Sequence, residues 1–130
     1  MATLTPTLTL ASTDATSDTA FTFTVTDSLS VGAPQAGLSK LAANASGGAD
    51  VTLHTTTANP TYFYIKHTGK QSDGSTSTTN KLEVKFGSTD ALRLSAEEFA
   101  FFPVVTGTAV KVVSNDSQTV LVEYLYFSAS

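Results

Sequence analysis

The feature of this sequence that most constrains its fold is the alternation of apolar and polar residues with a period of two. Phe21, Phe23 and Val25 alternate with threonines, and the segment 82–86 alternates apolar with charged residues. Successive side chains of a strand point to opposite faces, so this pattern predicts strands with one buried face. Seven to nine such segments follow one another, with no convincing helical pattern longer than two turns. The sequence predicts an all-β protein, an antiparallel two-sheet sandwich, with a jelly roll as its eight-strand form.

The length and the cysteine content limit how such a sandwich can be stabilised. A chain of 130 residues fits one domain with one core, so we expect residues 1–130 to form a single sandwich. The hydrophobic fraction of 41% is sufficient for a packed core. The absence of cysteine excludes disulfides, cysteine-based zinc sites and thiol nucleophiles.

The charge pattern argues against two classes of partner. Charged residues make up 14% of the chain, against about 25% in an average soluble protein. The net charge is −4, and the seven basic residues are scattered between Lys40 and Lys111 without forming a cluster. Nucleic-acid binding and electrostatic membrane attachment both need a basic patch. We therefore expect neither direct nucleic-acid binding nor a membrane partner.

The N-terminal segment contains the first candidate contact surface. Leu4, Leu8 and Leu10 alternate with threonines, and Pro6 occupies the apolar register without a backbone N–H to donate. Residues 1–12 are therefore predicted to be an N-terminal arm or an edge strand. The segment has neither the basic start nor the apolar run of a signal peptide, so we expect a chain that is not secreted by that route.

Two further segments differ from the strand pattern. Residues 34–47 carry the weakest pattern, so a short helical turn, a weak strand over Leu38–Ala45 and a loop all remain open. Residues 69–80 are polar throughout and contain no apolar side chain to bury. We predict that residues 69–80 form an exposed loop.

Four tyrosines on two predicted strands complete the candidate surface. Residues 62–67 carry large side chains on both faces, which indicates a central strand or an interface. Tyr62 and Tyr64 lie on one face of it, and Tyr124 and Tyr126 share a face of the last strand. A sugar-binding platform is an alternative use for such rings, but the chain has no Trp. The candidate interface residues are Leu4, Pro6, Leu8, Leu10, Tyr62, Tyr64, Tyr124 and Tyr126.

The residues that carry chemistry do not form a recognisable catalytic pattern. His54 and His67 lie on different predicted strands without metal-ligand spacing, and we expect them at the surface or in an interface. No serine lies in a Gly-x-Ser-x-Gly turn. Glu97 and Glu98 are adjacent, so on an extended segment they point to opposite faces. We predict a non-enzymatic protein with no catalytic residue, no metal and no cofactor.

Three segments between Val51 and Phe127 resemble one family of proteins. The stretch 62–68, Tyr-Phe-Tyr-Ile-Lys-His-Thr, resembles a strand of small structural proteins of tailed bacteriophage virions. The stretch 92–104, Leu-Arg-Leu-Ser-Ala-Glu-Glu-Phe-Ala-Phe-Phe-Pro-Val, and the stretch 120–127, Val-Leu-Val-Glu-Tyr-Leu-Tyr-Phe, are similar to two more of their segments. Ala96 replaces a turn glycine of that family, and His67 replaces an asparagine.

The resemblance implies a virion component. We expect first a capsid cement or decoration protein that stabilises the shell by bridging capsid subunits. Its partners would be the major capsid protein or other virion proteins, and it would form a homo-oligomer, a dimer or trimer. It would be made in the host cytoplasm and lie on the outer capsid surface in preference to the tail. The alternative is a tail, baseplate or fibre component with a receptor- or carbohydrate-binding role.

Overall fold

The computed structural model describes residues 2–16, 19–32, 38–54, 61–105 and 107–129, apart from the side chains of 14–16, 19 and 61. Within these ranges the chain forms twelve strands and no helix. The all-β prediction is therefore confirmed. The strand number exceeds the expected seven to nine, because eight strands build the sandwich and four more build two small sheets at the N-terminal end.

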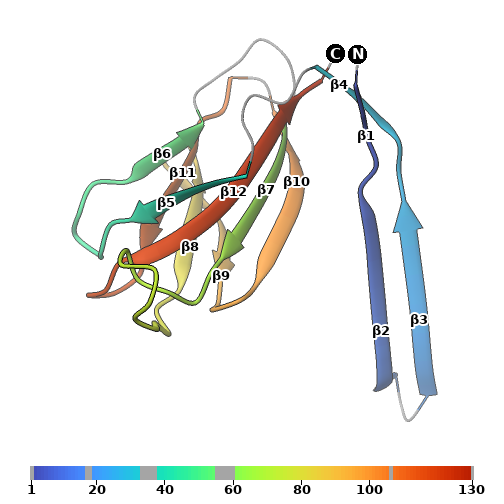
Figure 1. Ribbon diagram of the computed structural model, residues 1–130, viewed down its shortest axis with the longest axis horizontal. Helices are drawn as coiled ribbons and strands as arrows, with labels where there is room; N and C mark the ends of the chain where they lie inside the picture. The colour runs from blue at the N-terminus through green and yellow to red at the C-terminus, as the bar shows by residue number, and fades with distance from the viewer. Residues whose placement is uncertain (1, 17–18, 33–37, 55–60, 106, 130) are drawn as a thin grey trace.

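The sandwich consists of two four-stranded antiparallel sheets (Figure 1). The first sheet has the order β10-β7-β12-β5 and the second has the order β6-β11-β8-β9. The strands of the first sheet are β5 (Ser39–Ala43), β7 (Thr61–His67), β10 (Phe99–Val104) and β12 (Val120–Ser128). Those of the second sheet are β6 (Val51–His54), β8 (Leu82–Phe86), β9 (Thr89–Leu94) and β11 (Val110–Ser114).

The pairing of these eight strands is nested. The strand β8 pairs with β9, β7 with β10, β6 with β11 and β5 with β12. The two members of each pair therefore lie the same number of strands before and after the β8–β9 turn. This arrangement is one long hairpin wound into two sheets, which is a jelly roll. The predicted two-sheet sandwich therefore takes its eight-strand form.

The core lies between the two sheets and is centred on Phe63. This side chain is fully buried, and its ring centroid lies 5.8 Å from those of Phe102 and Tyr126 and 6.1 Å from that of Tyr124. Aliphatic residues from both sheets close the rest of the core. The fully buried ones are Ala43, Ile65, Leu82, Val84, Val110, Val112, Val120 and Val122.

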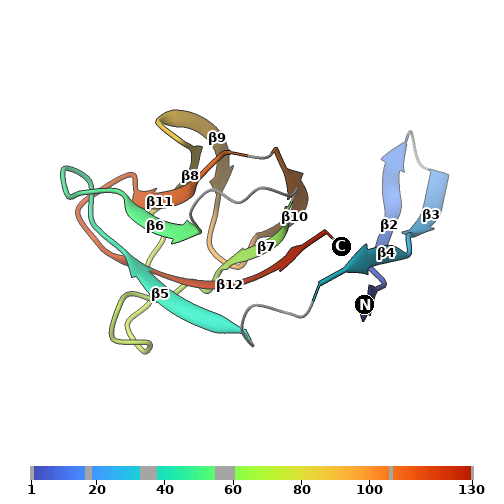
Figure 2. The same ribbon diagram turned by 90° about the horizontal axis from the view of Figure 1, so that it is seen from above.

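The N-terminal residues form a separate two-stranded hairpin beside the sandwich (Figures 1 and 2). It consists of β2 (Thr7–Thr16) and β3 (Thr19–Thr26), which pair antiparallel. At its base, β1 (Ala2–Leu4) pairs with β4 (Leu29–Val31). Figure 2 shows this hairpin standing apart from the two sheets.

The segments left open by the sequence are partly settled. Ser39–Ala43 is a strand that pairs with β12, so the strand alternative holds there, while residues 34–37 lie outside the described residues. The 69–80 loop exposes residues 72–77 but buries Thr78, whose hydroxyl donates to Gln118 Oε1 at 2.8 Å. Asp73 orders the tip by accepting from the backbone N–H groups of Ser75 and Thr76 at 2.9 and 2.8 Å.

The prediction that both histidines lie at the surface or in an interface is wrong. His67 is fully buried, its Nδ1 accepts from Gly69 N–H at 2.9 Å, and its Nε2 donates to Asn80 O at 2.8 Å. His54 is also buried because β6 contains a bulge, where Val110 pairs with His54 but the next residue pairs with Thr52. The extra residue, Leu53, breaks the alternation and turns His54 inward onto Tyr126.

Candidate interaction surface

Several titratable side chains of the described residues make structural contacts. No group of three His, Asp or Glu residues there is placed to hold a metal ion. The charged residues near β8 and β9 pair with each other: Arg93 Nη2 lies 2.7 Å from Glu83 Oε1, and Lys85 Nζ lies 3.4 Å from Asp50 Oδ2. Burial lowers the pKa of His54, which favours its neutral form within the aromatic core. The distinctive feature of the described surface is its exposed large apolar side chains.

The β2–β3 hairpin has two chemically different faces. Its register places threonine opposite threonine on one face, where the hydroxyls of Thr7 and Thr26 lie 3.2 Å apart, as do those of Thr9 and Thr24. The opposite face pairs Leu8 with Val25 and Leu10 with Phe23. We call this second face the apolar arm face; its members are Leu8, Leu10, Phe21, Phe23 and Val25.

The apolar arm face is exposed along its whole length. Its five side chains are 37–50% exposed to solvent, although a pleated strand places them all on one side of the hairpin. A hairpin of two strands has no second layer to bury such a face, and the sandwich does not provide one. Soluble proteins seldom expose so many large apolar side chains together unless the patch binds something.

A second exposed apolar surface lies on the outer side of β10. Phe99, Phe101 and Pro103 alternate with inward-facing residues, and the two phenylalanines are 60% and 41% exposed. Tyr62 of the neighbouring β7 stacks on Phe101 with ring centroids 6.4 Å apart. We call Phe99, Phe101, Pro103 and Tyr62 the β10 outer face. Pro103 lies in the edge strand β10, where a residue without a backbone N–H is tolerated because one side of the strand has no hydrogen-bonding neighbour.

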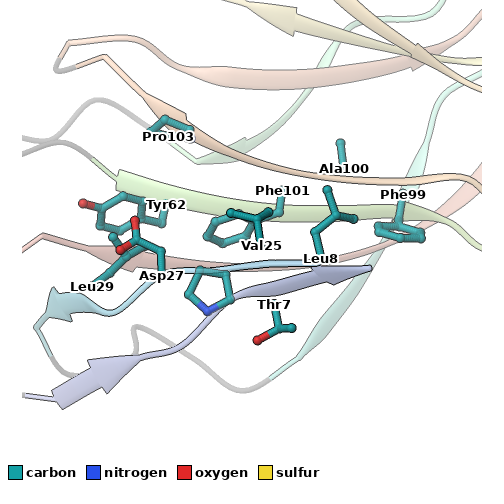
Figure 3. Close-up of a pocket in the computed structure, with 11 residues that line it drawn as sticks. Thr7, Leu8, Val25, Asp27, Leu29, Tyr62, Phe99, Ala100, Phe101 and Pro103 are labelled. Carbon is teal, nitrogen blue, oxygen red and sulfur yellow. The ribbon is translucent and has the colours of Figure 1, made fainter. Parts of the chain in front are cut away.

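A groove separates the hairpin from the β10 outer face (Figure 3). It has a volume of about 530 Å³ and is open to solvent. Figure 3 shows Leu8 and Val25 pointing across it toward Phe99 and Phe101. Pro6 and Leu29 line its end at the base of the hairpin, and Asp27 is the one charged residue in its described lining.

A polar pair limits the β10 outer face on its far side. Tyr64 shares that side of the sheet, and its hydroxyl donates to Glu123 Oε1 at 3.2 Å. Burial and the bond to this carboxylate raise the pKa of Tyr64, which keeps the phenol protonated near neutral pH. The apolar surface therefore runs from Phe99 to Tyr62 and gives way to polar groups at Tyr64.

The structure brings the four N-terminal candidate residues to the hairpin and its base. Leu8 and Leu10 belong to the apolar arm face, while Pro6 joins β1 to β2 and lines the groove. Leu4 pairs with Leu29 at the base and is half-buried.

The four tyrosines do not share a surface. Tyr124 pairs with Ile65 and Tyr126 with Phe63, so both point into the core, where they pack on the Phe63 ring. Tyr62 and Tyr64 point outward on the same sheet. We therefore retain Tyr62 in the candidate surface and assign Tyr124 and Tyr126 to the core.

Six members of the surface were not among the predicted interface residues. Phe21, Phe23 and Val25 have the pattern of a half-buried strand, and only the tertiary structure shows that no second layer covers them. Phe99, Phe101 and Pro103 did carry a signal. The segment 99–104 is apolar on both faces, which in an edge strand indicates an outer face that makes contacts.

Comparison with known proteins adds no identity. No protein-family model matches the chain, and no curated protein matches its sequence. Among the described residues, no helix is long and apolar enough to cross a membrane.

Proposed function

We propose that this protein is a non-enzymatic structural component of a virus particle, a capsid cement or decoration protein that stabilises the shell by bridging capsid subunits. The segments at 62–68, 92–104 and 120–127, which resemble small phage virion proteins, support the proposal. The jelly roll is compatible with it, since virus capsid domains and lectins use that fold among others. A jelly roll by itself does not determine function, because the same fold hosts many functions.

The observation that carries the proposal is the apolar arm standing clear of the sandwich (Figure 2). A component of an assembly needs contact surfaces that reach neighbouring subunits. The sandwich supplies one body and the hairpin supplies a second, joined to it through the β1–β4 pair. A face of five exposed apolar side chains suits a surface that is buried on assembly.

A contact of modest size is sufficient for a cement protein. A standard protein interface buries roughly 1,600 Å², and repetition around a shell multiplies the effect of each contact. The low content of Lys and Glu reduces the side-chain entropy lost when surface is ordered at such a contact.

The test is cryo-electron microscopy of the particles that carry this chain. Density on the outer capsid lattice at two-fold or three-fold junctions is the expected result. Density confined to the tail would keep the virion class but overturn the cement mechanism. Absence from every particle would overturn the proposal as a whole.

A matched variant tests the arm in the same assay. The backbone N–H of Asp27 donates to Pro6 O at 3.1 Å, so a short Gly-Ser link at this point can replace the whole hairpin. We expect the shortened protein to fold and to lose attachment to particles. A Thr22→Asp variant, which adds a charge on the threonine face, is the control and should attach normally.

A tail, baseplate or fibre component that binds a receptor or carbohydrate is a second candidate. One observation favours it: the groove combines the rings of Tyr62, Phe99 and Phe101 with the charged residue Asp27. Aromatic rings with a few polar groups in one hollow are typical of small-ligand sites. Calorimetry with a glycan panel tests this candidate, and loss of a binding signal in Tyr62→Ala would support it.

A further inference from the structure

We infer that the apolar arm face of each chain binds the β10 outer face of a second copy of this chain. The inference rests on the proposed function in one respect, since it takes the arm as an assembly surface and names its partner. The arm of one copy would cover Phe99, Phe101, Pro103 and Tyr62 of the other.

The hairpin needs a further layer of protein over its apolar face. A two-stranded hairpin is marginally stable in water, and packing against a further layer is what usually stabilises it. Here the strands β2 and β3 pack chiefly on each other. All five apolar side chains of their arm face are 37–50% exposed, so the stabilising layer is missing from the single chain.

The chain's own sandwich leaves both the apolar arm face and the β10 outer face exposed. Only Leu8 and Val25, near the root of the hairpin, face β10 across the groove (Figure 3). Near the tip, Phe21 borders a hollow whose described lining comes from the hairpin alone. The strand β2 has ten residues and β10 has six, about 33 and 20 Å at the usual rise, so one β10 strand, in either copy, spans about three-fifths of the arm.

The base of the hairpin is fixed to the sandwich. Val31 of β4 is buried, and it forms a bridge with Ala129 just after β12. The next residue, Gly32, donates its N–H to Ser128 O at 2.8 Å. These contacts tie the arm to the sandwich at one end, so it presents its apolar face in a defined direction.

The apolar arm face and the β10 outer face match in chemistry and area. Both are apolar, and no Lys, Arg or Glu lies within β2, β3 or β10. The exposed fractions of the five arm side chains and of Phe99 and Phe101 can be summed at about 200 Å² per large side chain. The sum is roughly 650 Å² for one contact between an arm and a β10 outer face. A closed dimer makes this contact twice and buries roughly 1,300 Å², within the 1,200–2,000 Å² of stable interfaces.

A second copy is favoured over a foreign partner because each chain carries both halves of the contact. A foreign protein that covered the arm would leave the β10 outer face exposed, and one that covered β10 would leave the arm exposed. A reciprocal exchange between two copies covers both at once, and it closes without leaving a free surface for further growth.

The first experiment measures mass in solution by light scattering after size-exclusion chromatography. We expect about 27 kDa for the unmodified protein at micromolar concentration, twice the 13.5 kDa of the chain. Phe23→Asp on the arm and Phe99→Asp on β10 should each return the mass to one chain. Thr22→Asp, on the threonine face of β3, should leave the dimer intact. Circular dichroism verifies that each variant retains its strands.

The second experiment identifies which surfaces meet. The chain has no cysteine, so single cysteines can be introduced without competing thiols. We expect a thiol cross-linker to join Phe23→Cys to Phe101→Cys in a mixture of the two variants. Replacing Phe23→Cys by Thr22→Cys should abolish the product. Cross-links that form between copies of Phe23→Cys alone would show arm-to-arm association and overturn the assignment of β10.

The two proposals fail separately. A monomeric protein that decorates capsids overturns the reciprocal contact and leaves the cement function standing. A dimer with the expected cross-links that is absent from every particle overturns the cement function and leaves the contact standing. A monomer in which the arm closes on its own β10, shown by a cross-link within one chain, also overturns the inference.

Discussion

Replacing Phe63 by alanine should distinguish the core of this protein from its arm when it is compared with the same change at Phe23. Phe63 is fully buried at the centre of the sandwich, whereas Phe23 is half-exposed on the hairpin. Both changes remove the same atoms from a strand residue. The difference between their effects on the free energy of unfolding therefore measures the surroundings of the two rings.

The magnitude follows from the contacts of the two rings. Phe63 lies within 6.3 Å, centroid to centroid, of four other rings, those of His54, Phe102, Tyr124 and Tyr126. Burial of a phenylalanine contributes about 1.5–3 kcal/mol, and the lost ring contacts and the cavity raise the expected destabilisation to about 3–5 kcal/mol. Phe23 packs against little beyond its own hairpin, so its loss should cost below about 1 kcal/mol in the single chain.

The assay is urea denaturation followed by circular dichroism, at the lowest protein concentration that gives a signal. With a slope of about 2 kcal/mol per molar urea, a loss of 4 kcal/mol lowers the midpoint by about 2 M. The Phe23→Ala midpoint should stay within about 0.5 M of the unmodified protein. A Phe63→Ala loss under about 1.5 kcal/mol, or an equal loss for both variants, would refute the assignment of core and arm.

Three further predictions concern single residues. Glu97 is the one described non-glycine residue with positive φ, at 71°. Because glycine adopts this conformation without strain, Glu97→Gly should stabilise the fold by up to about 1 kcal/mol. Thermal unfolding measures this change, and a lower melting temperature would contradict the prediction. The lowered pKa of His54 means that the unfolded chain binds the proton more readily. The contribution of neutral His54 to the free energy of unfolding is therefore complete above pH 6.5 and is lost as the pH falls below 6.5. His54→Phe should flatten the dependence of stability on pH in this range. An unchanged slope would refute the linkage. Hydrogen bonds from Thr76 and from the N–H of Ser75 lower the pKa of Asp73 from 3.8 to about 2. The contribution of the Asp73 carboxylate to the free energy of unfolding is therefore complete above pH 3.8 and is lost as the pH falls through 2. An NMR titration of Asp73 should find a pKa of about 2, and Thr76→Ala should raise this pKa.

The alternation of apolar and polar residues was a reliable guide along β8 and β12. Leu82, Val84 and Val122 point into the core as their alternation predicts. The alternation failed at His54, because a single extra residue at Leu53 reverses the face of the next side chain. Such a bulge depends on the pairing of β6 with β11, which lies about 60 residues further along the chain.

Burial was the second quantity that local pattern did not fix. Phe21, Phe23 and Val25 have the same alternation as core strands, yet they lie on an uncovered hairpin. Alternation specifies that one face of a strand is apolar, but whether another layer covers that face depends on where the rest of the chain lies. The same limit applies to Tyr124 and Tyr126, whose inward direction follows from their register with Phe63 and Ile65.

The sequence by itself determined the all-β class, because strand periodicity and turn residues are local properties of the backbone. It also determined the absence of cysteine chemistry, because this is a property of composition. Only the tertiary structure decided the nested strand order, the burial of the two histidines and the exposure of the arm. These depend on contacts between residues distant in sequence, and such contacts are fixed by the packing of the whole chain and not by any one segment of it.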